Sequence, residues 1–106
     1  MRKIFPLTAP GLKPPRVIEA IKRDVRKYLK RERRKDLPEG ADFWAFDCKV
    51  GRDRATPKVV HVAELNHAID KAVEDEWPEV YIEILAVPAN RMRREPGAPP
   101  ENETPD

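Results

Sequence analysis

The residues of this 106-residue chain best suited to chemistry are the lysines and arginines between positions 16 and 35. At the helical advance of about 100° per residue, six of them share one arc opposite an apolar stripe, two more border it, and only Glu19 interrupts it. The arc comprises Lys22, Arg23, Arg26, Lys30, Arg33 and Arg34, with Lys27 and Arg31 on its border. Cations aligned on one helix face can follow the phosphates of RNA or DNA. We therefore predict a nucleic-acid contact there; the alternative is a solvated face that only confers solubility.

Acidic groups could compete with nucleic acid for this arc. Residues 1–40 carry 13 Lys and Arg against 5 Asp and Glu, whereas residues 41–106 carry 8 against 14. A second expected helix bears Asp70, Glu74, Asp75 and Glu76, which could lie alongside the first helix and neutralise it. The last three also oppose the dipole at a helix C-terminus, and Glu79 extends this acidic corner. The alternative function is therefore a protein interaction module or homodimer in which the basic helix meets an acidic surface.

The open face of the expected sheet supplies a second set of candidates. If Trp44, Phe46 and Cys48 point towards the helices, their neighbours point away, and the outward set includes Phe43, Lys49, His61 and Tyr81. Domains that bind single-stranded RNA stack bases on such a surface. Asp47 and Glu83 would repel phosphate, and no RNA-recognition signature occurs in the chain. We rank this face below the helix and expect an ordinary outer surface or a dimer contact.

The remaining chemistry-bearing residues predict neither an enzyme nor a cofactor. His61 and His67 are the only histidines, and no metal-ligand spacing joins them to Cys48. Cys48 falls on the expected core face, where a thiol behaves as a small hydrophobic group. Four scattered glycines form no loop that could cradle a phosphate. We therefore expect a non-enzymatic binding or accessory domain with no metal site.

Twelve prolines divide the chain into windows, and the window from 16 to 37 predicts the basic helix itself. Its apolar residues recur at the helical period: Val17, Ile18, Ile21, Val25, Tyr28 and Leu29. Pro14 and Pro15 suit a helix start, since a first-turn residue needs no intrahelical N–H bond, and Pro38 to Gly40 supply a stop. The stripe ends at Leu29, so we expect residues 31–35 to overhang the core.

The other windows predict strands and a second helix. Residues 43–50 alternate, with Trp44, Phe46, Cys48 and Val50 on the core side. A polar connector leads into residues 58–62, which are β-branched; they could instead extend the following helix. That helix carries the stripe Leu65, Ile69, Ala72 and Val73 and ends at Trp77-Pro78, and an alternating strand follows from 80 to 87. Residues 3–7 form a short strand that Pro6 assigns to an edge.

The predicted order is thus strand, helix, strand, strand, helix, strand. This is the βαββαβ order of a ferredoxin-like, two-layer α+β sandwich, with two helices on one face of an antiparallel sheet. Residues 1–88 would make the single domain. Residues 89–106 contain almost nothing apolar after Met92 and read as a disordered tail rich in proline and acidic residues.

Bulk properties narrow the cellular setting. No stretch approaches the ~20 apolar residues of a membrane span, and no apolar segment follows the basic start as a signal peptide requires. The single cysteine cannot form an internal disulfide, as is usual for cytosolic chains. We expect a cytoplasmic protein with no membrane partner.

Four segments carry a resemblance to a known family. They are residues 3–35, from Lys-Ile-Phe-Pro-Leu onwards, Phe43-Trp44 to Gly51, His61 to Asn66, and Val80 to Leu85. Together they resemble a small uncharacterised bacterial family, a domain of unknown function, over most of residues 1–90. The resemblance implies a bacterial cytoplasmic protein and carries no assigned activity, so it transfers no catalytic residue.

Overall fold

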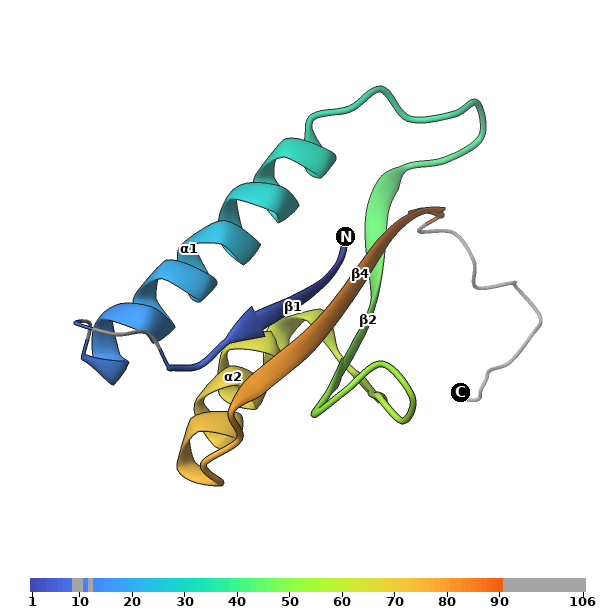
Figure 1. Ribbon diagram of the computed structural model, residues 1–106. Helices are drawn as coiled ribbons and strands as arrows, with labels where there is room; N and C mark the ends of the chain where they lie inside the picture. Colours follow the sequence, from blue (N-terminus) through green and yellow to red (C-terminus); the bar gives the residue numbers. More distant parts are fainter. Residues whose placement is uncertain (9–10, 12, 91–106) are drawn as a thin grey trace.

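The structure, a computed structural model, describes residues 1–8, 11 and 13–90. Along the chain lie β1 (Arg2–Pro6), α1 (Pro14–Arg33), β2 (Phe43–Gly51), β3 (Lys58–Val60), the 3-10 turn η1 (Val62–Glu64), α2 (Leu65–Glu74) and β4 (Glu79–Ala89). The predicted α+β class and element order are confirmed (Figure 1). The two prolines expected at the start of α1 are its first residues.

The four strands form one sheet in the order β1-β4-β2-β3, and every neighbouring pair is antiparallel. This order puts β4 and β2 at the centre, so the predicted ferredoxin-like arrangement is not confirmed. Val80, Ile82 and Ile84 make β4 strongly apolar, and all three are fully buried. A strand with this composition is most stable between two neighbours, whereas β1, which contains Pro6, lies at an edge as expected.

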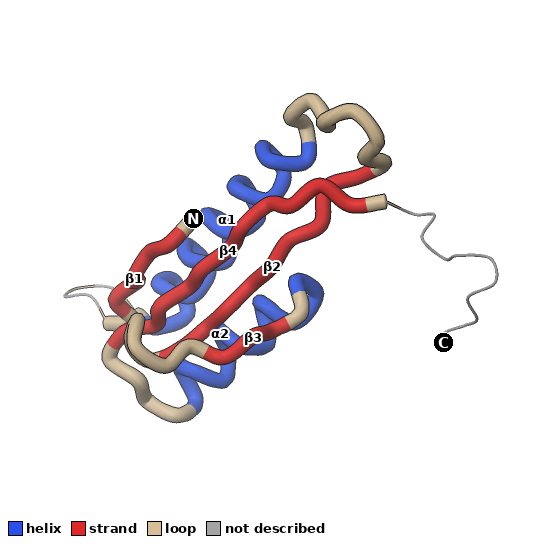
Figure 2. The backbone as a smooth tube through the Cα atoms, turned by 90° about the vertical axis from the view of Figure 1, so that its right-hand side faces the viewer, coloured by secondary structure: helices blue, strands red, loops and turns tan. Residues whose placement is uncertain are grey.

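Both helices cover the same face of the sheet (Figure 2). The core between the two layers takes Val17, Ile21 and Val25 from α1, Leu65, Ile69 and Ala72 from α2, and Cys48 and Val50 from β2. Phe46 packs against this core, and Trp44, two residues earlier on the same side of β2, is half-buried. The predicted core side of β2 is therefore confirmed.

For residues 58–62 the sequence allowed either a strand or an extension of the following helix, and the structure contains some of each. Lys58–Val60 is a strand paired with residues 48–50 of β2. The chain then turns at His61, whose Nδ1 accepts a hydrogen bond from the Ala63 amide at 3.3 Å, and Val62 begins η1. β3 is consequently only three residues long and pairs only with residues 48–50 of β2.

α2 ends before Trp77-Pro78 in a left-handed turn. Glu76 has a φ of 60°, the Trp77 amide donates to the Ala72 carbonyl at 3.0 Å, and the Glu76 amide donates to the Val73 carbonyl at 3.0 Å. These two bonds define a Schellman motif, whose left-handed position is usually glycine. Glu76, just after α2, is thus held in a left-handed backbone conformation that residues with a side chain disfavour.

At the other end of the sheet, β4 continues to Ala89, which pairs with Phe43. The strand therefore extends one residue past the predicted boundary at 88, and residues 91–106 of the predicted tail lie outside the described residues. No helix in the described part of the chain is both long and apolar enough to cross a membrane.

Candidate nucleic-acid interface

A row of cations runs along the outward side of α1, the side opposite its buried stripe. Five of its members follow one another at intervals of 7, 4, 3 and 4 residues, and a sixth borders the row. We call this set the basic ridge: Arg16, Arg23, Lys27, Lys30 and Arg34, with Arg26 beside them. All six are exposed, and none has an ion pair or ring contact with any other described residue.

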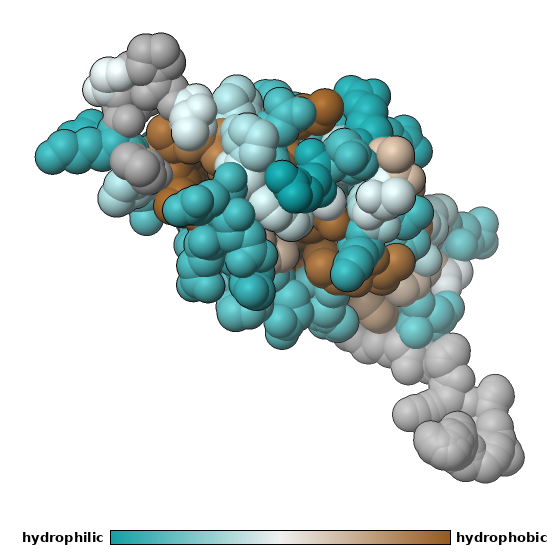
Figure 3. Space-filling model, turned by 60° about the horizontal axis from the view of Figure 1, so that its bottom comes forward, coloured by the Kyte–Doolittle hydropathy of each residue, from teal (hydrophilic) through white to brown (hydrophobic). Residues whose placement is uncertain are grey.

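The arc predicted from the sequence begins at Lys22 and omits Arg16. Its spacing of seven residues from Arg23 is the signal that could have identified it. The exposed Glu19 interrupts the basic ridge, as its spacing predicts, and the exposed Asp24 borders it, so six cations stand against two anions. On the face drawn in Figure 3, hydrophilic residues dominate and hydrophobic residues form separate patches.

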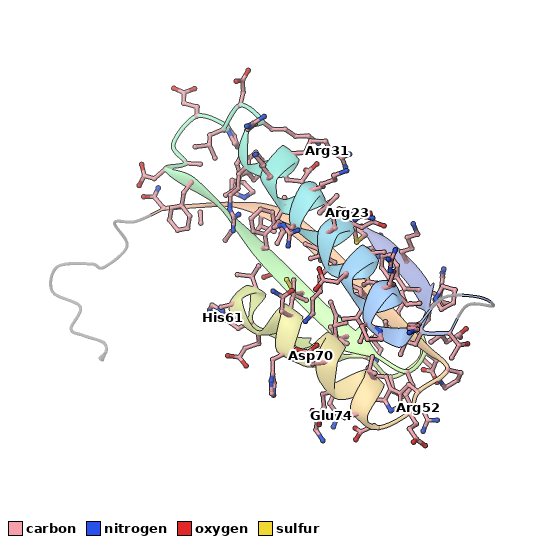
Figure 4. The ribbon with its side chains drawn as sticks, turned by 90° about the vertical axis from the view of Figure 1, so that its left-hand side faces the viewer. Arg23, Arg31, Arg52, His61, Asp70 and Glu74 are labelled. Carbon is pink, nitrogen blue, oxygen red and sulfur yellow. The ribbon has the colours of Figure 1, made fainter. Side chains whose placement is uncertain are left out.

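Lys22 belongs to a different environment from the basic ridge. Its Nζ lies 2.7 Å from an Asp70 carboxylate oxygen on α2, and its side chain is only 20% exposed. Figure 4 shows Asp70 on the side of α2 that faces α1, with Arg23 further out on α1. The neutralisation expected from α2 therefore reaches Lys22, which is tied to α2 rather than presented to a ligand.

Arg31 also has an intramolecular role. Its guanidinium lies 5.3 Å from the centre of the Tyr28 ring and 3.6 Å from a Glu32 carboxylate oxygen. Glu32 is 8% exposed, and Lys35 Nζ lies 2.9 Å from the same carboxylate oxygen. The hydrogen bond from Lys35 lowers the pKa of Glu32 below its usual value and Arg31 adds to this, while desolvation opposes it.

The end of α1 contacts β2, so the expected overhang of residues 31–35 is not found. The Trp44 indole N–H donates to the Lys35 carbonyl at 2.9 Å, and the Arg33 guanidinium lies 5.2 Å from the centre of the Phe46 ring. These contacts border a groove of about 480 Å³ between the end of α1, β2 and η1. We call it the edge groove; its walls include Arg33, Trp44, Phe46, His61 and Val62.

The acidic corner leaves the basic ridge uncovered. Asp75 lies 3.5 Å from Lys71 on its own helix, and Glu74 and Glu76 are exposed. Figure 4 places Glu74 at the far end of α2, away from Arg23 and Arg31. The acids of α2 therefore take one cation of the predicted arc, Lys22, and leave the outward row open.

On the other face of the sheet, Tyr81 is not placed for base stacking. The residue is 4% exposed, the Arg54 guanidinium lies 5.7 Å from its ring centre, and its hydroxyl donates to Glu83 at 2.8 Å. This bond raises the pKa of Tyr81 and lowers the pKa of Glu83, and Arg2, 3.6 Å from Glu83, lowers the latter further. Arg54 of loop 51–57 thus covers Tyr81, which the alternation of side chains along the strand would leave exposed.

Of the other three candidates of the open face, only Lys49 joins the Tyr81–Glu83 pair, where its charge helps to lower the pKa of Glu83. Lys49 is exposed opposite Glu83, Phe43 is half-buried at the far end of β2, and His61 lies beyond the end of β3 at the start of η1. The structure therefore gives this face a closed polar stack at one end and no continuous aromatic surface.

Cys48 and the histidines form no common site. The Cys48 thiol is 1% exposed, and burial, with Asp47 adjacent, raises its pKa above the usual value. A buried thiol with a raised pKa is a poor nucleophile. Within residues 1–8, 11 and 13–90 no three side chains of His, Cys, Asp or Glu come close enough together to hold a metal ion.

Comparison with known proteins identifies a family without identifying an activity. Neither the curated proteins nor the solved structures contain a match to this chain. One family model matches residues 1–95, which cover every element of the sheet and both helices. The chain therefore belongs to DUF6172, a family of unknown function.

Proposed function

We propose that this protein binds nucleic acid through the basic ridge of α1. The observation that carries the proposal is the row itself: six exposed cations, five along α1 and Arg34 at its C-cap, without acidic partners among the described residues. A row of like charges costs self-repulsion, which a polyanion would relieve. Lys22, Arg31 and Arg33 of the original candidate set contribute less, because each is engaged with another part of the fold.

The dimensions of the ridge suit a phosphate backbone. Arg16 and Arg34 are 18 residues apart, which corresponds to about 27 Å at a rise of about 1.5 Å per residue. Long, flexible Lys and Arg side chains spread over this length can each reach a different phosphate. No aromatic side chain stands within the row, so this surface would recognise the backbone and not the bases.

The decisive experiment measures binding of fluorescently labelled 20-nucleotide RNA and DNA, single-stranded and duplex, by anisotropy. We expect the affinity to fall as salt rises from about 50 to about 200 mM, with a log-log slope of about 0.7 to 0.9 per phosphate contact. Arg23→Glu/Lys27→Glu should then remove at least two contacts and reduce the slope by about 1.4 to 1.8.

A matched control uses the hairpin between β2 and β3. Arg52→Glu/Lys58→Glu changes the net charge by the same amount, at positions outside α1. This variant should keep the slope of the parent protein. Equal losses in both double variants would show a general charge effect, and no binding of any probe at about 50 mM salt would overturn the proposal.

A second candidate function rests on the acidic corner. Glu74, Glu76 and Glu79 are exposed and could bind the basic ridge of a second copy of the chain. The acidic surface of another protein could bind the basic ridge in the same way. Sedimentation of the protein at low and high concentration separates the two ideas. Self-association abolished both by Arg23→Glu/Lys27→Glu and by Glu74→Lys/Glu79→Lys would favour the protein contact over nucleic acid.

A further inference from the structure

The first half of β2 has a neighbouring strand on one side only. β4 pairs with the whole strand from Phe43 to Gly51, whereas β3 pairs only with residues 48–50. Figure 2 shows β3 beside the lower part of β2, and the upper part has no strand beyond it. Residues 44–47 therefore form a free sheet edge about 13 Å long, at about 3.3 Å per residue.

The hydrogen-bond pattern identifies which backbone groups point outwards from this edge. The Ile84 amide donates to the Met1 carbonyl, so even-numbered residues of β4 bond to β1 and odd-numbered residues face β2. The register joins Leu85 to Asp47 and Val87 to Ala45, so odd-numbered residues of β2 bond to β4. The N–H and C=O groups of Trp44 and Phe46 consequently point away from β4, along the line that β3 occupies further on.

The edge groove lies beside these groups. Its floor is mainly apolar, with Trp44, Phe46 and Val62, and its helix wall carries Arg33. Asp47 also lines the groove but forms no ion pair with Arg33. The Arg33 guanidinium is exposed, rests on the Phe46 ring and has no acidic partner among the described residues. The Phe46 carbonyl accepts only a long contact from the Cys48 thiol, at 3.8 Å, and the Phe46 N–H and both backbone groups of Trp44 bond to no described residue. Such groups can pair with an extended chain, and a guanidinium without an acidic partner beside an apolar floor can pair with a carboxylate.

We propose that the free edge of β2 binds a short extended segment of a partner protein by strand addition. The added strand continues the line of β3 and forms up to four backbone hydrogen bonds with Trp44 and Phe46. Its side chains on the helix side alternate between an apolar group over the groove floor and an acidic group that pairs with Arg33. This site is distinct from the basic ridge, because Arg33 lines the edge groove and Arg34 does not.

The test uses a blocked five-residue peptide with glutamate at both ends, isoleucine in the centre and threonine between them. The full chain, labelled with ¹⁵N, is titrated with up to about 5 mM peptide, and the Trp44 indole and Phe46 amide signals are followed. We expect these signals to shift saturably. N-methylation of the isoleucine amide, which removes a ladder donor, should weaken binding at least about tenfold, as should lysine in place of glutamate.

Two adjacent arginines provide the matched control. Arg33→Glu should weaken peptide binding at least about tenfold, and Arg34→Glu should leave it within about twofold, whereas nucleic-acid binding should depend on Arg34. A failure of one proposal is therefore distinguishable from a failure of the other. Absence of saturable shifts, or binding that survives N-methylation and Arg33→Glu, would overturn the strand-addition site.

Hydrogen exchange of the free protein supplies an independent check. The Phe46 amide should exchange fast and the Ala45 amide slowly, because only the latter bonds to β4. Slow exchange of Phe46 without peptide would show that the edge is already paired. Slow exchange that disappears on dilution would assign the edge to a second copy, and slow exchange at every dilution would assign it to the chain itself; both results overturn the proposal.

Discussion

The two helices lie on the same face of the sheet, yet they use charge in opposite ways. α1 ends with Lys30, Arg31 and Arg33 in its last turn, where cations favour the helix dipole, and its outward side carries the basic ridge. α2 ends with Glu74 and Asp75, where anions oppose the dipole, and continues into Glu76 with a positive φ. The charge of α1 agrees with local helix physics, and the charge of α2 conflicts with it.

This difference shows what holds each helix in place. α2 has only 10 residues and an unfavourable end, so its stability comes from Leu65, Ile69 and Ala72, which are all buried. α1 has 20 residues and a favourable end, so its outward side is free of any structural duty. A surface that the fold does not need can be kept for a ligand, and the basic ridge is such a surface.

The largest expected effect is a loss of stability from a substitution in the buried side of α2, compared with a substitution on the basic ridge of α1. Ile69 is fully buried, and Ile69→Ala should lower the free energy of unfolding by about 2–5 kcal/mol through lost burial and a cavity. Lys30→Ala on the basic ridge should change it by less than about 0.5 kcal/mol. Urea unfolding followed by circular dichroism measures both, and comparable losses in the two variants would refute the distinction.

The next effect concerns the ion pair that joins the helices. Lys22 and Asp70 are 2.7 Å apart, but Asp70 is 49% exposed, so solvent screens the pair. Lys22→Ala should cost about 0.5–1 kcal/mol of unfolding free energy. A double-mutant cycle with Asp70→Ala isolates the coupling, and Lys22→Met keeps the aliphatic stem as a control. A coupling energy of zero would mean that Lys22 is solvated like the cations of the basic ridge and is not held by Asp70.

Local periodicity accounts for the parts of the fold that could be predicted from sequence. The stripe from Val17 to Leu29 and the alternation of β4 depend on neighbours within one element, so they specify type and face without knowledge of the rest. Strand order depends on which strands meet across the sheet. The short alternating run of β1 does not reveal that β4, and not β1, lies at the centre.

The candidate site divides in the same way. Helical spacing placed Arg23, Lys27 and Lys30 on the outward side, and its extension to Arg16 was available from the same rule. Spacing could not show that Arg33 rests on Phe46 or that Arg54 covers Tyr81, since each contact joins separate elements. The free edge of β2 was hidden for the same reason, because it depends on β3 stopping at Val60.

A smaller effect of opposite sign is expected where α2 ends. Glu76 adopts a left-handed conformation that glycine adopts without strain, so Glu76→Gly should raise the free energy of unfolding by about 0.5–1 kcal/mol. The same change at Glu74, the last residue of α2, should lower it, because glycine is a poor helix former. Thermal unfolding of both variants checks the pair, and a loss at both positions would contradict the strain assigned to the end of α2.

The smallest effect at neutral pH concerns the end of α1 and is recognised by its pH dependence. Lys35 and Arg31 hold the pKa of Glu32 below its usual value, so the folded state binds this proton less readily than the unfolded state. The stabilisation is complete above the unfolded pKa and is lost as pH falls through the folded pKa. Glu32→Gln should therefore lower Tm at pH 7 and approach the parent protein near about pH 3. A Tm difference independent of pH would mean that Glu32 stabilises α1 by packing and not by its charge.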